Sequence, residues 1–273
     1  TGVVNTLVVA NRVKATVGDH VSIEAVGSDA SDTETVDGES GDVSVEADDD
    51  SFLLALAGAL SASGSVGVGA TVATLVFSKE VEASIGSNGS IYADGTISVI
   101  AGLNGGNKDK VMLLAIAFGI SGSAGVAGDV STLVFVNKTT AALGGNVQAD
   151  GDLNVKAAAD SELYNIAAAA AASGSAAVSA VAIVTYFQNE TYAFLRSGTN
   201  AGTSDAHIGG NVSILANSRE TVDADAAGIS GSGAASVGGT LDVIVTQVKT
   251  KAYTDSNVNI HADGDLQVEA KED

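Results

Sequence analysis

The side chains in this chain that could do chemistry are mainly carboxylates, because acidic residues outnumber basic ones by 33 to 12. Asp48, Asp49 and Asp50 follow one another, and Asp263 and Asp265 stand on either side of a glycine. Clustered carboxylate oxygens are ligands that hard cations prefer, so these aspartates are weak candidates for a calcium site. The EF-hand loop and the calcium-binding nonapeptide repeat are absent from the sequence. Calcium is therefore the one cofactor that the sequence suggests.

The residue types that serve as nucleophiles or bases have no partner motifs. His20, His207 and His261 each stand near an expected turn in a different part of the chain. A serine flanked by glycine recurs four times, whereas a nucleophilic mechanism needs one such serine. Cysteine is absent, which excludes disulfides and thiolate metal ligands. We therefore expect no catalytic residues and no enzyme activity.

The recurring serines belong to an internal repeat that covers the chain. Its centres, whose first serines are 58, 52 and 57 residues apart, are Ser63-Gly64-Ser65, Ser121-Gly122-Ser123, Ser173-Gly174-Ser175 and Ser230-Gly231-Ser232. An apolar run after each centre ends near a common alanine, found at Ala83, Ala141, Ala193 and Ala252, with Ala15 as the N-terminal counterpart. We interpret residues 1–273 as a single array, with a partial copy at 1–50 and full copies at 51–106, 107–160, 161–219 and 220–273.

The last segment of three copies predicts pairs of short strands. Residues 91–99, 147–155 and 260–268 alternate Ile, Leu or Val with polar residues on both sides of an Asp-Gly pair. A period of two is typical of a half-buried strand, and glycine is expected to supply a positive φ at the corner. The pattern favours an all-β fold, a parallel β-solenoid of about four to five repeats of 52–68 residues.

Three long uncharged runs allow another interpretation. Residues 52–77, 111–128 and 166–187 are long enough to span a membrane, and the alanine-rich stretch 166–172 has a high helix propensity. A membrane-associated helical repeat protein is therefore a further hypothesis. We favour strands without membrane insertion, because Asp129 and Asp242 accompany the equivalent runs and charge in lipid is costly. Glycines inside a period-two pattern also suit strands that lie unusually close to another layer.

The strands of the apolar runs carry apolar residues on both faces. In Leu75-Val76-Phe77 and Leu133-Val134-Phe135, neighbouring residues point to opposite faces and all are apolar. Such strands need cover on each side, as the strands of buried parallel sheets have. We expect that cover to come from another layer of the coil or from another molecule, so self-association is a predicted property.

The formal net charge of -21 disfavours nucleic acid and anionic lipid as partners. Part of this charge lies in an insertion at 28–40, which we interpret as a solvated loop, and a second insertion is expected at 197–206. The first residues already look like the middle of a repeat. We therefore expect the sequence to be a segment of a longer protein.

Three motifs give a family resemblance over nearly the whole chain. They are the apolar Ser-Gly-Ser run, the Asn-x-Thr-x-Ala segments at 137–141 and 189–193, and the Ala-Asp-Gly-Asp-Leu-x-Val-x-Ala segments at 149–157 and 262–270. This combination resembles the repeats of large bacterial filamentous adhesins, such as the leukotoxin-type repeats of fusobacteria and the filamentous-haemagglutinin-like surface proteins. The resemblance implies a secreted, surface-attached, right-handed parallel β-solenoid. The strong acidity and the two insertions depart from that pattern.

Two main classes of function follow. The first is a structural or adhesive extracellular protein, a stiff solenoid segment of a cell-surface fibre or filament. It would associate with itself through apolar faces or uncapped ends, and a host surface or matrix ligand would be a further partner. The second is a β-helix enzyme acting on polysaccharide, which would need a non-repeated cluster of Asp, Arg and Lys in a groove. The few basic residues form no such cluster in the sequence, so we favour the first class.

Overall fold

The computed structural model describes residues 1–27, 41–102, 107–203 and 207–273, and the regular elements in these residues are all β-strands. Paired strands of neighbouring coils run parallel throughout. The predicted all-β parallel solenoid is therefore confirmed. The acidic insertion at 28–40 and residues 204–206 of the second insertion lie outside the described residues.

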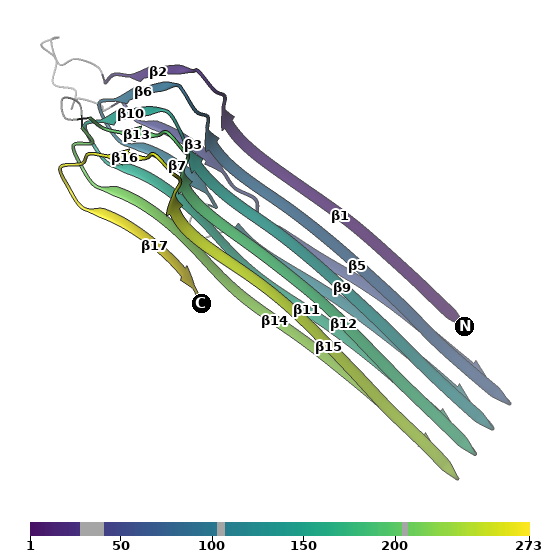
Figure 1. The fold of residues 1–273 in the computed structure, drawn as a ribbon. Helices are drawn as coiled ribbons and strands as arrows, with labels where there is room; N and C mark the ends of the chain where they lie inside the picture. Colours follow the sequence, from purple (N-terminus) through teal and green to yellow (C-terminus); the bar gives the residue numbers. More distant parts are fainter. Residues whose placement is uncertain (28–40, 103–106, 204–206) are drawn as a thin grey trace, which may run out of the picture.

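Each coil is long and narrow (Figure 1). In the fourth coil, β14 (Val212–Ser232) runs out to a tip and β15 (Ala235–Thr254) runs back beside it. β16 (Asn259–Ile260) then leads the chain to β17 (Leu266–Glu272), which starts the next coil. At about 3.3 Å per residue, the 20-residue β15 is about 66 Å long. We call the paired long strands the arm, and the end closed by the short strand the wide end.

Stacked coils build three parallel sheets. The outgoing sheet contains β3 (Val43–Ala47), β7 (Ile97–Ala101), β11 (Leu153–Ser173), β14 and β17, and β4 (Ser51–Ser63) and β8 (Asn107–Ser121) extend it along the arm. The return sheet contains β1 (Gly2–Val17), β5 (Val66–Ile85), β9 (Ala124–Leu143), β12 (Ala176–Leu195) and β15. The corner sheet, at the wide end, contains β2 (Ser22–Ala25), β6 (Ser90–Ala93), β10 (Asn146–Ala149), β13 (Asn200–Ala201) and β16.

The interior holds one hydrophobic core at the wide end and another along the arm. Ile91 and Leu153 are buried in the first core, and Leu75 and Phe135 in the second. Near the tip, glycine lets the outgoing and return sheets approach closely, because a Cβ on Gly69 would lie 2.1 Å from the Phe118 carbonyl oxygen. The prediction that interior glycines mark closely packed layers is confirmed at this position.

The helical interpretation of the alanine-rich run is wrong. Residues 166–172 lie inside β11, which pairs with β8 on one side and with β14 on the other. Two ladders of backbone hydrogen bonds and a buried inner face outweigh the helix propensity of alanine. Within the described ranges, no helix is long and apolar enough to cross a membrane.

The register of the coils agrees with the predicted repeat at the common alanine. Ala15, Ala83, Ala141, Ala193 and Ala252 pair in one continuous row across the return sheet. The predicted centre of the last copy is wrong by two residues, because Ser173 pairs with Ser232 and not with Ser230. The tip of that coil is therefore formed after Ser232, at residues 233–234.

The role predicted for glycine in the Asp-Gly corners is also wrong. Most positive φ angles lie instead between the return and corner sheets, for example at Asn88 (59°) and Asn257 (57°). The Asp-Gly glycines are needed for stacking, because a Cβ on Gly151 would lie 2.9 Å from the backbone of Gly95 in the preceding coil. Gly151 N also donates a hydrogen bond to Gly95 O at 3.0 Å. Contact between coils, rather than the turn conformation, selects glycine here.

Candidate functional site

Apolar side chains cover part of the outer face of the arm in the outgoing sheet. Phe52, Leu54, Leu56 and Leu60 on β4 are 46–67 % exposed, because they alternate with positions that face the interior. Phe118, on the neighbouring β8, is 41 % exposed. We call this surface the outgoing patch; it comprises Phe52, Leu54, Leu56, Leu60, Leu114, Ile116 and Phe118.

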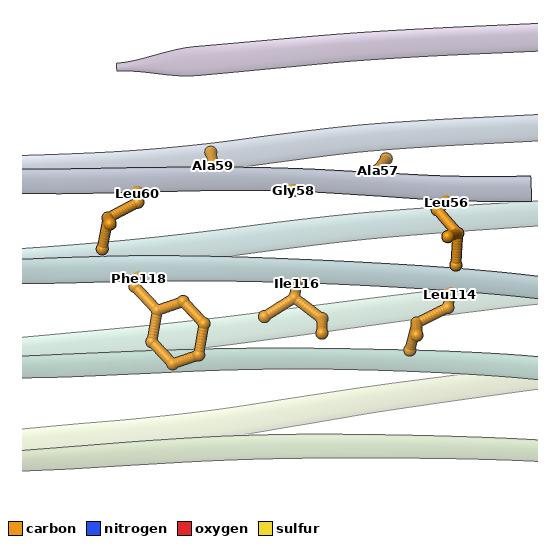
Figure 2. Close-up of a pocket in the computed structure, with 8 residues that line it drawn as sticks. All are labelled: Leu56, Ala57, Gly58, Ala59, Leu60, Leu114, Ile116 and Phe118. Atoms are coloured by element: carbon orange, nitrogen blue, oxygen red, sulfur yellow. The ribbon is translucent and has the colours of Figure 1, made fainter.

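Gly58 produces a groove within the outgoing patch. Figure 2 shows Leu56 and Leu60 on either side of Gly58, with Ile116 and Phe118 on the next strand. The groove has a volume of about 500 Å³. A Cβ at Gly58 would find only the Ile116 carbonyl oxygen, 3.7 Å away, so the space above this glycine is open. An apolar side chain of a second surface would fit such a groove.

The outer face of the return sheet is also apolar along the arm. Val4, Val72 and Val130 pair in one row that continues to Leu241 through Ala182. The exposed fractions are 76 % for Val4, 38 % for Val72, 42 % for Val130 and 60 % for Leu241. The expectation of two apolar faces is therefore confirmed for this sheet, and within the described chain no further layer covers its outer side.

Towards the wide end, the outer face of the return sheet becomes charged with alternating sign. Arg12, Glu80, Lys138, Glu190 and Lys249 occupy one row across the five strands. Each charged group in this row therefore has the opposite sign to its neighbours on adjacent strands. Opposite charges side by side stabilise cross-strand pairs, so the row favours this register of coils.

The first members of this row form ion pairs. Arg12 Nε lies 2.7 Å from Glu80, and Lys14 Nζ lies 2.7 Å from both Glu80 and Glu82. The hydrogen bond from Lys14 lowers the pKa of each of these glutamates. Both carboxylates therefore stay ionised at neutral pH and are poor general acids.

The polysaccharide-enzyme hypothesis requires acidic and basic side chains together in a groove. These two glutamates line the surface groove that best resembles such a cluster. The groove, of about 300 Å³, is lined by Glu80, Glu82, Lys138, Thr140, Tyr192, Phe194, Arg196 and Tyr253. Phe194 and Tyr253 stack with ring centroids 4.9 Å apart. A glycosidase of the usual type needs one carboxyl group with a raised pKa, whereas both glutamates here have lowered values.

The structure separates the predicted calcium candidates into two places. Asp48, Asp49 and Asp50 lie between β3 and β4 in the first described coil, whereas Asp263 and Asp265 lie between β16 and β17 in the last. Asp50 Oδ1 accepts a hydrogen bond from Lys108 N at 2.7 Å, and Asp263 pairs with His207 at 2.8 Å. In the part of the chain that the structure describes, no group of three or more His, Asp or Glu side chains is arranged to hold a metal ion.

The histidines and tip serines take structural positions. His20 adopts a φ of 59° in a corner, and His207 lies 6.3 Å from His261, ring centroid to ring centroid. At the tips, Ser173 Oγ donates to the Ala176 carbonyl oxygen and Ser232 Oγ to that of Ala235. These serines close the turn between outgoing and return strands, as their repetition suggests.

A polar layer crosses the interior between the two cores. The return sheet contributes one row of side chains to this layer: Asn11, Lys79, Asn137 and Asn189. The outgoing sheet contributes the opposite row: Ser51, Asp109, Ser161 and Glu220. Lys79 Nζ lies 2.7 Å from Asp109 Oδ1, and both side chains are fully buried. Burial raises the pKa of Asp109 to about 7, although Lys79 opposes the shift.

Sequence reasoning missed this buried pair, because Lys79 stands beside Glu80 and Glu82 in what looks like a charged surface segment. A signal was present in the repeat. Lys79 lies four residues before the common alanine Ala83, and the same position in other copies is Asn11, Asn137 or Asn189. A lysine that replaces an inward-facing asparagine must itself face inward.

Comparison with known proteins gives no relatives: no family model, no curated protein and no solved structure matches this chain.

Proposed function

We propose that this chain is a structural protein, a stiff β-solenoid segment of an extracellular or cell-surface fibre that associates sideways with other copies of itself. The observation that carries this proposal is the pair of apolar outer faces on the arm. Leu56 is 58 % exposed on one face and Val4 is 76 % exposed on the other. Large contiguous apolar surfaces on soluble proteins usually mark interaction sites. Two such faces on opposite sides allow each rod to contact two neighbours.

Charge favours association through these faces over in-register stacking of coil ends. A copy that placed its β1 beside β15 of another, in the register of the array, would bring Arg12 next to Lys249 and Lys14 next to Lys251. In the outgoing sheet the same stacking would bring Glu46 next to Glu269. Like charges about 4.8 Å apart on adjacent strands repel. The outgoing patch contains no charged residue, so contact there adds no such repulsion.

Parallel ladders supply the stiffness that a fibre needs. β11 and β14 pair through 21 residues and β12 and β15 through 20, so adjacent coils are joined along nearly their whole length. In repeat architectures of this kind each unit depends on its neighbours to bury its faces. We infer that the array unfolds cooperatively and resists bending.

The test combines sedimentation velocity with negative-stain electron microscopy of the purified chain. We expect concentration-dependent assemblies of rods lying side by side. Leu56→Glu combined with Phe118→Glu should disperse them, because it places charge in the outgoing patch. Asn259→Glu combined with Gln267→Glu adds the same charge at exposed positions of β16 and β17 outside both apolar faces, so it is the matched control and should assemble like the parent chain. A parent chain that stays monomeric at every accessible concentration would overturn the proposal.

A further inference from the structure

Lys79 and Asp109 face each other inside the polar layer at a distance that suits a reaction. Lys79 Nζ is 2.7 Å from Asp109 Oδ1, and neither side chain is exposed to solvent. Because the carboxyl carbon is bonded to Oδ1, Nζ lies within about 4 Å of that carbon. This is close to the roughly 3–3.5 Å that separates reacting atoms in a near-attack arrangement.

A second carboxylate stands beside the amine. Lys79 Nζ donates to the backbone oxygen of Asp49, and Asp49 Oδ2 is 3.8 Å from the same nitrogen. Ser51 Oγ donates to Asp49 Oδ1 at 3.1 Å, and Asn11 Nδ2 lies 3.5 Å from Oδ2, so the Asp49 carboxylate is held in place. A carboxylate fixed at this position can accept a proton from the amine and return it to a leaving group.

We propose that Lys79 and Asp109 condense in the folded protein to an amide that joins β5 covalently to β8. A proton moves first from Nζ to Asp109 along their hydrogen bond, which gives a neutral amine and a carboxylic acid. The lone pair of Nζ then attacks the Asp109 carboxyl carbon and a C–N bond forms. Asp49 takes a proton from Nζ and delivers it to the departing hydroxyl group. The C–OH bond then breaks and one water leaves. The sum is an amine and a carboxylic acid giving an amide and water, with no oxidation or reduction.

The surroundings favour the protonated form of Asp109 that this reaction needs. Burial raises the pKa of Asp109 to about 7, so a protonated carboxyl group is accessible near neutral pH. Asp109 Oδ2 has no hydrogen-bond partner among the described side chains and backbone groups, which leaves it unsolvated. Two charges buried between apolar cores carry a large desolvation cost, and condensation removes both. The water that forms is lost to solvent, and the fold holds the two groups together as a high effective concentration.

The cross-link is independent of the proposed function, and its test does not depend on assembly. Intact mass spectrometry of the denatured chain should show the loss of one water, about 18 Da, relative to the sequence. Protease digestion should yield one branched peptide in which Lys79 is joined to Asp109, closing a loop whose ends are 30 residues apart. We expect near-complete condensation after incubation of the folded chain at pH 6–7, about the pKa of Asp109.

The repeat itself provides the matched control. Asparagine already occupies the same row of the return sheet at Asn11, Asn137 and Asn189, so Lys79→Asn should fold. Asp109→Ser likewise introduces the residue found at Ser51 and Ser161. Both variants should keep a β-sheet circular dichroism spectrum and show no branched peptide.

One other reaction needs to be distinguished from the cross-link. Succinimide formation at Asp94-Gly95 or Asp150-Gly151 also removes one water, but it produces no branched peptide and persists in Lys79→Asn. Asp49→Asn should fold, and its Lys79 and Asp109 should condense at about one hundredth of the parent rate or more slowly, because the proton carrier is lost. A parent chain of unreduced mass, or one whose water loss is unchanged in Lys79→Asn, would overturn the proposal.

Discussion

Asn137 donates its side-chain amide to the Asn189 side-chain oxygen of the next coil at 2.9 Å, and both side chains are fully buried in the polar layer. Asn189 in turn donates to Glu220 Oε1 at 2.5 Å across the coil. The amide row therefore links successive coils along the axis and links the return sheet to the outgoing sheet. On β5 Lys79 interrupts the row, and Asn137 Oδ1 has no hydrogen-bond partner in the described structure.

Removing one amide from this row should destabilise the fold. Asn137→Ala leaves Asn189 Oδ1 buried without its donor, and a buried unsatisfied polar atom costs about 1–3 kcal/mol. Urea unfolding followed by circular dichroism measures the loss. The control is Asn200→Ala, in the exposed amide row of the corner sheet, where Asn200 donates to Asn146 at 2.8 Å and water can replace the bond. Equal losses in the two variants would contradict a special role for the interior row.

Much of this architecture could be predicted from the sequence, because period-two alternation sets which residues face inward. The alanine row is an example, since each copy keeps a small residue where the coil bends towards the corner sheet. The tip of the fourth coil could not be fixed in the same way. Ser230-Gly231 and Ser232-Gly233 are identical dipeptides two residues apart, and a shift of two leaves every side chain on the same face. Only the pairing of Ser173 with Ser232 decides between them.

The functional features, namely the buried Lys79–Asp109 pair, the apolar faces and the groove at Gly58, were harder to predict. The buried pair depends on contacts between sheets. The sequence placed Asp49 in a calcium candidate, whereas the structure brings it to Lys79 from a segment 30 residues away. The two apolar faces followed from Leu75-Val76-Phe77, since adjacent apolar residues must point to opposite sides. The groove at Gly58 did not follow, because glycine in a strand does not indicate whether its open side faces a layer or solvent.

Close approach of the sheets predicts opposite effects for two glycines of the arm. Gly69→Ala would place a Cβ 2.1 Å from the Phe118 carbonyl oxygen, so the backbone must shift and we expect a loss of about 2 kcal/mol or more. Gly128→Ala has no atom within 4 Å of the new Cβ and should be neutral or stabilising by about 0.5 kcal/mol. Thermal unfolding of the two variants at one protein concentration measures both. A tolerated Gly69→Ala would mean that the two layers are further apart.

Buried carboxyl groups predict that the fold becomes less stable as the pH rises from acidic to neutral. Burial raises the pKa of Asp129 to about 6 and also raises that of Glu220. A group with a raised folded-state pKa binds its proton more tightly in the folded chain, so its stabilisation is complete below the ordinary pKa near 4. For Asp129 that stabilisation is lost as the pH passes 6. Asp109 that has not condensed with Lys79 acts in the same direction, and its stabilisation of the fold is lost as the pH rises past about 7.

Asp129→Asn isolates this contribution. The variant should be more stable than the parent at pH 7 by about 1–2 kcal/mol and should show a flatter dependence of unfolding free energy on pH between 4 and 7. Urea titrations at several pH values between 4 and 8 provide the measurement. Asp223→Asn, at an exposed site on β14, is the comparison for a simple change in net charge. Parallel pH profiles for the parent and Asp129→Asn would show that Asp129 does not titrate in this range.

The charges at the two ends of the array predict a way to convert sideways association into end-to-end growth. Lys251 pairs internally with Tyr192 and Glu269 with Leu215, so neither has a charged neighbour in its own row within the chain. Lys251→Glu combined with Glu269→Lys keeps the net charge at -21 and turns two repulsive contacts, with Lys14 and Glu46 of a second copy, into attractive ones. We expect longer rods in electron micrographs at low salt. Added salt of about 0.5 M should shorten them, because exposed charges are screened. Rods of unchanged length at low salt would show that charge does not limit stacking at these strand edges.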